Sequence, residues 1–76
     1  MITKIFTVGV YDMLHIGHIL LFKHAKELEE NSMLIVAVQD SETILKYKPN
    51  TKIINNTEER VFMVGSIRYV DKVVVY

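Results

Sequence analysis

The sequence has no cysteine, no tryptophan, one proline and three glycines among its 76 residues. Without cysteine, neither a disulfide framework nor a thiolate metal site can form. Nine basic and nine acidic residues give a formal net charge of +0, so the overall charge attracts neither nucleic acid nor an anionic membrane surface. No apolar run approaches the roughly 20 residues of a membrane-spanning helix, and the first residues lack the pattern of a signal peptide. We therefore expect a cytoplasmic protein that binds neither nucleic acid nor membranes.

The composition is that of one small globular domain. Hydrophobic residues make up 50% of the chain and charged residues 24%, which is typical of folded rather than disordered sequences. We predict strands at about 4–8, 33–38 and 72–76, and helices at about 17–30, 41–46 and 57–66. Ser41 is the predicted cap of the second helix. The spacing of Asn56 and Glu59 predicts a capping box at the start of the third.

Strands that alternate with helices predict an α/β fold, here a Rossmann-like, parallel three-stranded sheet with helices on both faces. This is half of a doubly wound fold, in which the first strand is expected in the middle. The later strands that would pair with its other edge are not in these 76 residues, so that edge would be open and apolar. Because such an edge invites another chain, we expect a homodimer or a higher assembly through the exposed sheet edge.

One stretch combines several features of a phosphate site. Gly9 follows the first predicted strand, and Gly17 lies between His15 and His18, where the next helix should begin. The first turn of a helix has free N–H groups and the positive end of the helix dipole, which together suit phosphate. The two histidines are three residues apart and so lie on one face of a helical turn. Both imidazoles would then donate hydrogen bonds to phosphate oxygens and to the charge that develops on them during transfer.

Two other interpretations of these histidines stay open. They can be a helix cap or ordinary surface residues, which is what the spacing alone favours. They can also bind a metal ion together with Asp12, although the sequence offers no acidic residue at the usual spacing for a fourth ligand.

The motif 7–18 reads T-V-G-V-Y-D-M-L-H-I-G-H. It resembles the pattern T-x-G-x-F-D-x-x-H-x-G-H of the nucleotidyltransferases of the cytidylyltransferase type. A second segment, I-R-Y-V-D-K-V at 67–73, is similar to the I-R-Y-V-D-x-V of the glycerol-3-phosphate cytidylyltransferases within that family. The resemblance runs from about residue 4 to residue 74 and corresponds to the N-terminal part of the family domain.

The resemblance implies a role for each matching residue. The catalytic residues would be His15, His18 and Lys46. The residues implied in binding the nucleotide and its phosphates are Thr7, Gly9, Val10, Tyr11, Asp12, Gly17, Lys48 and Arg68.

Some of these positions depart from the family or allow another interpretation. The family usually has a small hydroxyl residue in place of Val10 and phenylalanine in place of Tyr11. For the two lysines, a solvated basic loop is the alternative. Arg60 also falls on a family arginine position, but for it we expect an ion pair with a carboxylate, Glu59 or Asp71.

The implied reaction transfers CMP from CTP to a phosphorylated alcohol such as glycerol 3-phosphate, with release of pyrophosphate. Mg²⁺ would bridge the triphosphate and need few protein ligands, so no metal site on the protein is expected. Two alternatives remain: an ATP-using adenylyltransferase such as an FAD synthase, some of which share the two histidines, and a non-catalytic, dimerising remnant of the fold. The family's second phosphate-binding motif and most of its base recognition belong to the downstream half of the family domain.

Overall fold

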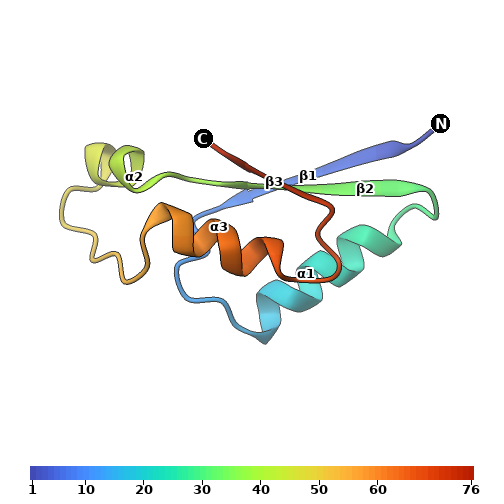
Figure 1. Cartoon of the computed structure of the whole chain (residues 1–76), viewed down its shortest axis with the longest axis horizontal. Helices are drawn as coiled ribbons and strands as arrows, with labels where there is room; N and C mark the ends of the chain where they lie inside the picture. The colour runs from blue at the N-terminus through green and yellow to red at the C-terminus, as the bar shows by residue number, and fades with distance from the viewer.

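The computed structural model describes residues 1–76. Three parallel strands form one sheet in the order β1-β2-β3, and three helices connect or flank them (Figure 1). The elements are β1 (Thr3–Gly9), α1 (Ile16–Glu27), β2 (Ser32–Val38), α2 (Ser41–Tyr47), α3 (Thr57–Gly65) and β3 (Lys72–Val75). The predicted Rossmann-like, parallel three-stranded sheet is confirmed, and all six predicted elements are present.

The hydrophobic core lies between β2 and two helices. On one face of the sheet, Leu34, Val36 and Val38 pack with Phe22 from α1 and Val64 from α3, and all five side chains are 0% exposed. Burying a side chain of this size contributes about 1.5–3 kcal/mol. On the other face of β2, Ile35 and Ala37 are also buried, at 6% and 8% exposed, which explains why the 33–38 run is apolar at every position.

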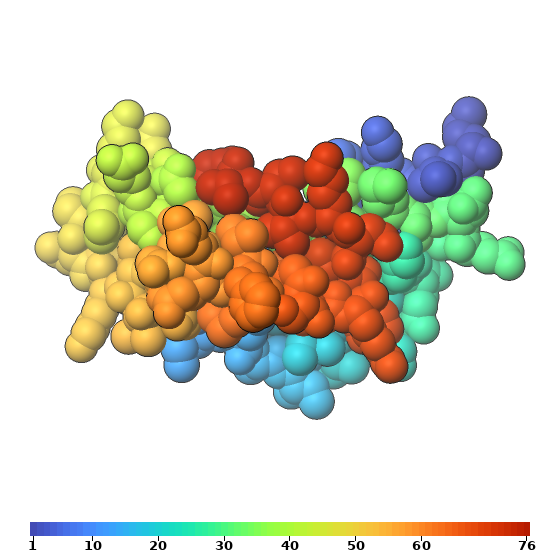
Figure 2. All heavy atoms as spheres, in the orientation of Figure 1, coloured from blue at the N-terminus to red at the C-terminus, as the bar shows by residue number.

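The two crossover helices lie on the same face of the sheet, whereas we predicted helices on both faces. α1 and α3 share the core cluster described above, and α2 lies beyond the carboxyl end of β2 (Figure 1). The reason is the strand order: the chain steps from β1 to β2 to β3 in one direction. Two right-handed crossovers in the same direction place both helices on one side. Figure 2 shows α3, in orange, in the middle of the front face.

The opposite face and one edge of β1 are open. Phe6 and Val8 pair in register with Ile35 and Ala37, on the face without a crossover helix, and they are 64% and 65% exposed. Within these 76 residues β2 is the middle strand, and β1 lies at the edge of the sheet. The open, apolar edge is therefore present as expected, and association through it stays a prediction.

The structure has no helix with the length and hydrophobicity that a membrane span requires.

The helix ends follow local chemistry with two differences from the prediction. The capping box of Asn56 and Glu59 at the start of α3 is confirmed. α2 is capped by Asp40 rather than Ser41, because the Asp40 carboxylate accepts the Thr43 N–H at 2.6 Å. α1 ends at Glu27, three residues earlier than predicted, where the Ser32 hydroxyl donates to a carbonyl of its last turn.

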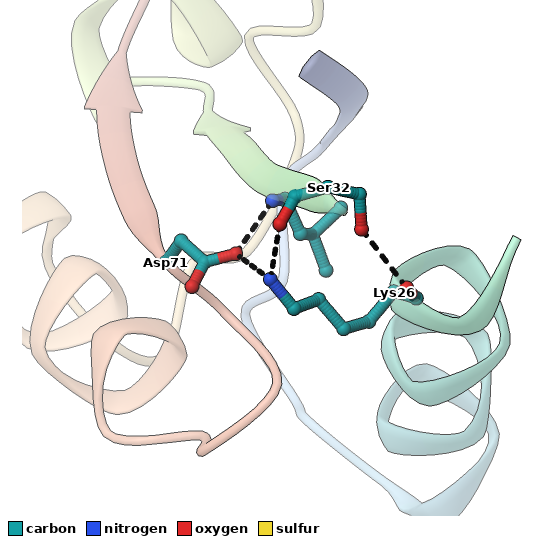
Figure 3. A network of polar contacts seen from close by, with 4 residues as sticks. Lys26, Ser32 and Asp71 are labelled. Atoms are coloured by element: carbon teal, nitrogen blue, oxygen red, sulfur yellow. Dashed lines mark hydrogen bonds and ion pairs between the residues drawn. The ribbon is translucent and has the colours of Figure 1, made fainter. Parts of the chain in front are cut away.

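A polar network joins the end of α1 to the starts of β2 and β3 (Figure 3). Lys26 Nζ donates to Asp71 Oδ2 and to the Ser32 carbonyl, both at 2.5 Å. The same Asp71 oxygen accepts the Leu34 N–H at 2.7 Å. The Lys26 hydrogen bond first, and the Leu34 N–H second, hold the pKa of the Asp71 carboxyl below its ordinary value.

Replacing Asp71 with asparagine should lower the free energy of unfolding by about 1 kcal/mol near neutral pH. The effect is modest because the Lys26 and Asp71 side chains are 31% and 36% exposed and water screens them. A carboxyl whose pKa is lowered by folding stabilises the folded state above its unfolded-state pKa. That contribution is lost as the pH falls through the folded-state pKa. In urea unfolding measured from about pH 2 to pH 7, the free energy of unfolding should therefore decrease less toward acid pH in Asp71→Asn than in wild type.

The matched control is Glu30→Gln, which removes an exposed carboxylate outside this network and should leave the pH curve unchanged. Identical curves for wild type and Asp71→Asn would contradict the prediction.

Candidate functional site

The turn after β1 is folded around the ring of Tyr11. This residue has φ 54°, in the left-handed region that residues other than glycine rarely adopt. Its side chain is 6% exposed and lies against Gly9, where an added Cβ would come within 2.8 Å of the ring. The Tyr11 hydroxyl shares a hydrogen bond with Thr7 Oγ1 at 3.2 Å. Gly9 and Thr7 therefore hold the protein's own ring, and their contact with a ligand stays a prediction.

His15 and His18 together cap α1. His15 Nδ1 accepts the Gly17 N–H at 2.9 Å, and His18 Nδ1 accepts the His15 N–H at 3.2 Å. This is a capping box in which two imidazoles take the roles usually filled by Ser or Thr and Glu or Gln. The ring centroids are 4.1 Å apart, so the two rings lie side by side as the spacing predicts. A Cβ on Gly17 would come within 2.6 Å of the His15 ring, which explains the glycine at this position.

The cap also fixes which nitrogen of each ring is free. Because each Nδ1 accepts an N–H, each neutral imidazole carries its proton on Nε2. Both rings therefore offer an Nε2–H donor at the positive end of α1. Burial first, and the neighbouring charge of His15 second, lower the pKa of the His18 imidazole below its ordinary value. His18 is thus a neutral donor near neutral pH, suited to a phosphate oxygen or a developing oxyanion.

Asp12 ties this turn to the segment before α3. Its carboxylate accepts the N–H groups of Ile54 and Asn55, both at 2.7 Å, and its carbonyl accepts the Asn55 side-chain amide at 2.7 Å. The Ile54 N–H is the main reason that the pKa of the Asp12 carboxyl lies below its ordinary value. The carboxylate orders the turn, and each of its oxygens accepts one backbone N–H there.

Arg60 is fully buried and holds the ends of two strands. Its NH1 donates to the carbonyls of Val10 and Gln39, at 2.9 and 2.6 Å, just beyond β1 and β2. The expected ion pair of Arg60 with Glu59 or Asp71 is wrong: Glu59 completes the α3 cap, and Asp71 pairs with Lys26 (Figure 3). The remaining donors of the guanidinium go to neutral oxygens: Ser41 Oγ at 2.8 Å, the Asn55 carbonyl at 3.0 Å and Thr57 Oγ1 at 3.3 Å.

The structure contains one cleft, at the carboxyl ends of β1 and β2 against α2. It has a volume of about 180 Å³ and is lined by Val10, Gln39, Ile44, Tyr47, Lys48 and Thr51. Two predicted binding residues, Val10 and Lys48, thus lie at this cleft, while the two histidines do not line it.

The other predicted basic residues are exposed. Lys46 is on α2, with Nζ 5.6 Å from the centroid of the Tyr47 ring. Arg68 precedes β3 and donates to the Tyr69 hydroxyl at 2.9 Å. Arg68 lies before the amino end of β3, and because the strands are parallel, that end of the sheet is opposite to the cleft. Neither side chain contacts the two histidines, and their catalytic and binding roles stay predictions.

The residues present do not form a metal site. No group of three His, Cys, Asp or Glu side chains is arranged to hold an ion, and the carboxylate of Asp12 is occupied by backbone donors. Asp12, His15 and His18 therefore do not act as a set of ligands. That Mg²⁺ arrives with the triphosphate stays a prediction.

Sequence reasoning missed Arg60 and Gln39 as organisers of this region. A signal for Arg60 was present: it lies four residues before Val64 and so falls on the apolar side of α3. A charged residue on such a stripe is buried and must be satisfied from within the protein. Gln39 carries no comparable signal.

Comparison with known families decides what this fold and motif belong to. A model of the family described as "Cytidylyltransferase-like" matches residues 6–76. The chain belongs to the cytidylyltransferase-like family.

Its relatives include FAD synthases and bifunctional proteins, all longer than this chain. The chain is 48% identical over 67 residues to an FAD synthase of Pyrococcus abyssi, covering 88% of this chain and 43% of that one. It is 31% identical to the bifunctional protein HldE of Campylobacter fetus, over 97% of this chain and 16% of that one. A lipopolysaccharide core biosynthesis protein from Thermoplasma volcanium has the same fold, with a TM-score of 0.82 and 26% identity over 97% of this chain and 57% of its own. The chain thus spans less than half of the FAD synthase.

Removing the buried guanidinium should destabilise this cytidylyltransferase-like domain severely. Arg60→Gln leaves the Val10 and Gln39 carbonyls without their donor, and we expect a loss of about 3 kcal/mol in urea unfolding. Arg60→Lys keeps the charge but not the five-donor fork and should cost nearly as much. Arg68→Gln, which alters an exposed arginine, is the control and should change stability by less than about 0.5 kcal/mol. Equal stability of the two glutamine variants would contradict this account.

The pKa of His18 should rise when its charged neighbour is removed. In His15→Asn the new side chain can still cap α1, while the charge that lowers the His18 pKa is gone. We expect the pKa of His18, followed by NMR titration, to move up but to stay below the ordinary 6.5, because burial remains its larger cause. An unchanged or lower pKa in His15→Asn would show that the two rings do not interact as described.

Proposed function

We propose that this chain binds the phosphates of a nucleoside triphosphate at the start of α1 and takes part in nucleotidyl transfer. The observation that carries the proposal is the pair of adjacent imidazoles, 4.1 Å apart, whose Nδ1 atoms are both engaged in the helix cap. Their Nε2–H groups are left as donors at the positive helix end, where phosphate is favoured. The family match over residues 6–76 supports the same chemistry.

In the proposed reaction, a phosphate oxygen of the acceptor attacks the α-phosphorus of the triphosphate. A new P–O bond forms, the bond to the bridging β-phosphate oxygen breaks, and pyrophosphate leaves with the electron pair. A phosphate monoester is already a nucleophile, so no strong general base is required. The Nε2–H groups of His15 and His18 would stabilise the charge that develops on the phosphate oxygens, and positioning would supply much of the rest.

We favour ATP as the donor. Relatives at 48% and 45% identity over most of this chain are FAD synthases, and making FAD from a flavin phosphate requires an adenylyl group. The acceptor would then be flavin mononucleotide (FMN). The second candidate is the pair CTP and glycerol 3-phosphate, supported by the I-R-Y-V-D-K-V segment at 67–73. Because the chain spans 43% of the first FAD synthase, the activity of a whole protein is part of this proposal.

Pyrophosphate release tests the proposal directly. The purified chain is assayed with Mg²⁺, either with ATP and FMN or with CTP and glycerol 3-phosphate. We expect release with the first pair, and a loss of about 10²–10³-fold in His18→Ala. Addition of Mg²⁺–ATP should also shift the backbone amide signals of Gly9 and Gly17 in the NMR spectrum.

The matched control is His24→Ala, which removes an exposed histidine from the same helix and should leave the rate unchanged. A folded sample that releases no pyrophosphate with either pair, and whose amide signals do not shift, would overturn the proposal. That result would favour the non-catalytic, dimerising module.

A further inference from the structure

The ring of Tyr11 is the middle member of an aromatic chain that runs from the hydrophobic core to the phosphate turn. Its centroid is 5.4 Å from that of Phe22, which is 0% exposed, and 5.5 Å from that of the His18 imidazole. Both pairs are edge-to-face, with interplanar angles of 60° and 80°, an arrangement that aromatic rings prefer. His18 is therefore connected to the core through Tyr11.

The backbone and two neighbouring residues keep the Tyr11 ring in this place. Gly9 leaves the space that the ring fills, and Thr7 Oγ1 shares a hydrogen bond with the Tyr11 hydroxyl at 3.2 Å. The left-handed backbone of Tyr11, with φ 54°, is costly for most residues with a side chain. Glycine or asparagine would adopt it more easily. What this position gains in return is the ring and its contacts.

The Tyr11 side chain is poorly placed to contact a nucleotide itself. It is only 6% exposed, and its hydroxyl is already bonded to Thr7. His18, in contrast, is half-buried, with an Nε2–H that no hydrogen bond within the protein uses. An effect of Tyr11 on a bound phosphate would therefore have to pass through His18.

The other contacts of the His18 ring restrain it weakly. Its Nδ1 accepts the His15 N–H at 3.2 Å, the long end of the usual range for such a bond. The His15 ring beside it is exposed. Burial is the larger cause of the low pKa of His18, and His15 is the source of the only charge among the causes. Tyr11 is thus the buried contact that both orients the imidazole and keeps water from one side of it.

We propose that Tyr11 is a positioning residue for His18. Its ring, held by Gly9 and Thr7, sets the direction in which the His18 Nε2–H points, and it does not itself contact the nucleotide. The inference rests on the proposed nucleotidyl transfer for what His18 acts on, but the coupling of the two rings can be tested without any nucleotide. It also gives Gly9 and Thr7 a role in the site through the ring that they hold.

The test replaces Tyr11 and follows His18 by NMR in the protein alone. Tyr11→Asn removes the ring, while asparagine still tolerates the left-handed backbone. We expect the pKa of His18 to rise toward its ordinary value, because the imidazole becomes more hydrated. Hydrogen exchange of the His15 amide, whose acceptor is the His18 ring, should become about tenfold faster. Tyr11→Phe keeps the ring and should leave both quantities at their wild-type values.

A second variant disturbs the Tyr11 ring without replacing it. In Gly9→Ala the new Cβ would come within 2.8 Å of the ring, and the ring has to move. Both quantities should then change in the same direction as in Tyr11→Asn. Gly9→Ala decides the question alone if Tyr11→Asn does not fold.

The matched control is Tyr69→Asn, which removes a half-buried ring that packs on the same core and whose hydroxyl also takes part in one hydrogen bond. It should leave the His18 pKa and the His15 exchange unchanged, even where it lowers stability. The Gly17 amide, which donates to the His15 ring, is an internal control, and its exchange in Tyr11→Asn should change less than that of the His15 amide. Wild-type values of both quantities in Tyr11→Asn and Gly9→Ala, or equal changes in Tyr69→Asn, would overturn the inference.

The pyrophosphate assay separates this inference from the proposed function. In a chain that releases pyrophosphate, Tyr11→Asn should lower kcat about tenfold with little change in the KM for the triphosphate. Signals of His18 that respond to Tyr11 in a chain without any pyrophosphate release would remove the proposed function and keep this inference. Pyrophosphate release with the same kcat and the same His18 signals in Tyr11→Asn would do the reverse.

Discussion

The buried guanidinium of Arg60 is the constraint on which the rest of the candidate site depends. Burying a charged group is costly unless its hydrogen bonds are made inside the protein. Arg60 has five N–H donors and makes five hydrogen bonds, all to neutral oxygen atoms. Its charge also lowers the pKa of the carboxyls of Asp12 and Asp40, behind the hydrogen bonds that each carboxylate accepts. The arginine therefore donates directly to carbonyl and hydroxyl oxygens, and it interacts with the carboxylates of Asp12 and Asp40 through its charge.

Arg60 and Asp12 both connect the β1–α1 turn to the segment before α3. Arg60 lies on α3 and reaches back to the carbonyl of Val10, while Asp12 lies in the β1–α1 turn and accepts N–H groups from Ile54 and Asn55. Arg60 thus bonds one carbonyl in each loop, at Val10 and Asn55, while Asp12 bonds the second loop from within the first. Such a reciprocal arrangement leaves little freedom to the turn that carries Tyr11 in a left-handed conformation. The energetic cost of that conformation is offset by contacts between residues that are more than 40 positions apart in the sequence.

That distance explains what the sequence could and could not predict. The six elements, the capping box of Asn56 and the side-by-side histidines follow from short-range patterns, and the structure contains them. The ring of Tyr11 on Gly9, the bonds of Arg60 and the cleft under α2 depend on tertiary packing. The predicted ion pair of Arg60 with Glu59 or Asp71 was wrong because the sequence carries no information on the neutral oxygens that reach Arg60 from across the fold. The placement of α1 and α3 on one face of the sheet was missed for a different reason. It depends on the direction in which the chain crosses from strand to strand, which the elements themselves do not specify.

The histidines show how one pair of side chains can serve both folding and chemistry. The Nδ1 atoms cap α1 and so contribute to the stability of the helix. The same bonds fix the tautomer that leaves Nε2–H free. A cap built from serine and glutamate would stabilise the helix equally well but would place a negative charge, not a donor, beside a phosphate. Imidazole is the side chain that can accept through one nitrogen and donate through the other while remaining neutral. The low pKa of His18 preserves that neutral state, because its burial and the nearby ring of His15 both oppose protonation.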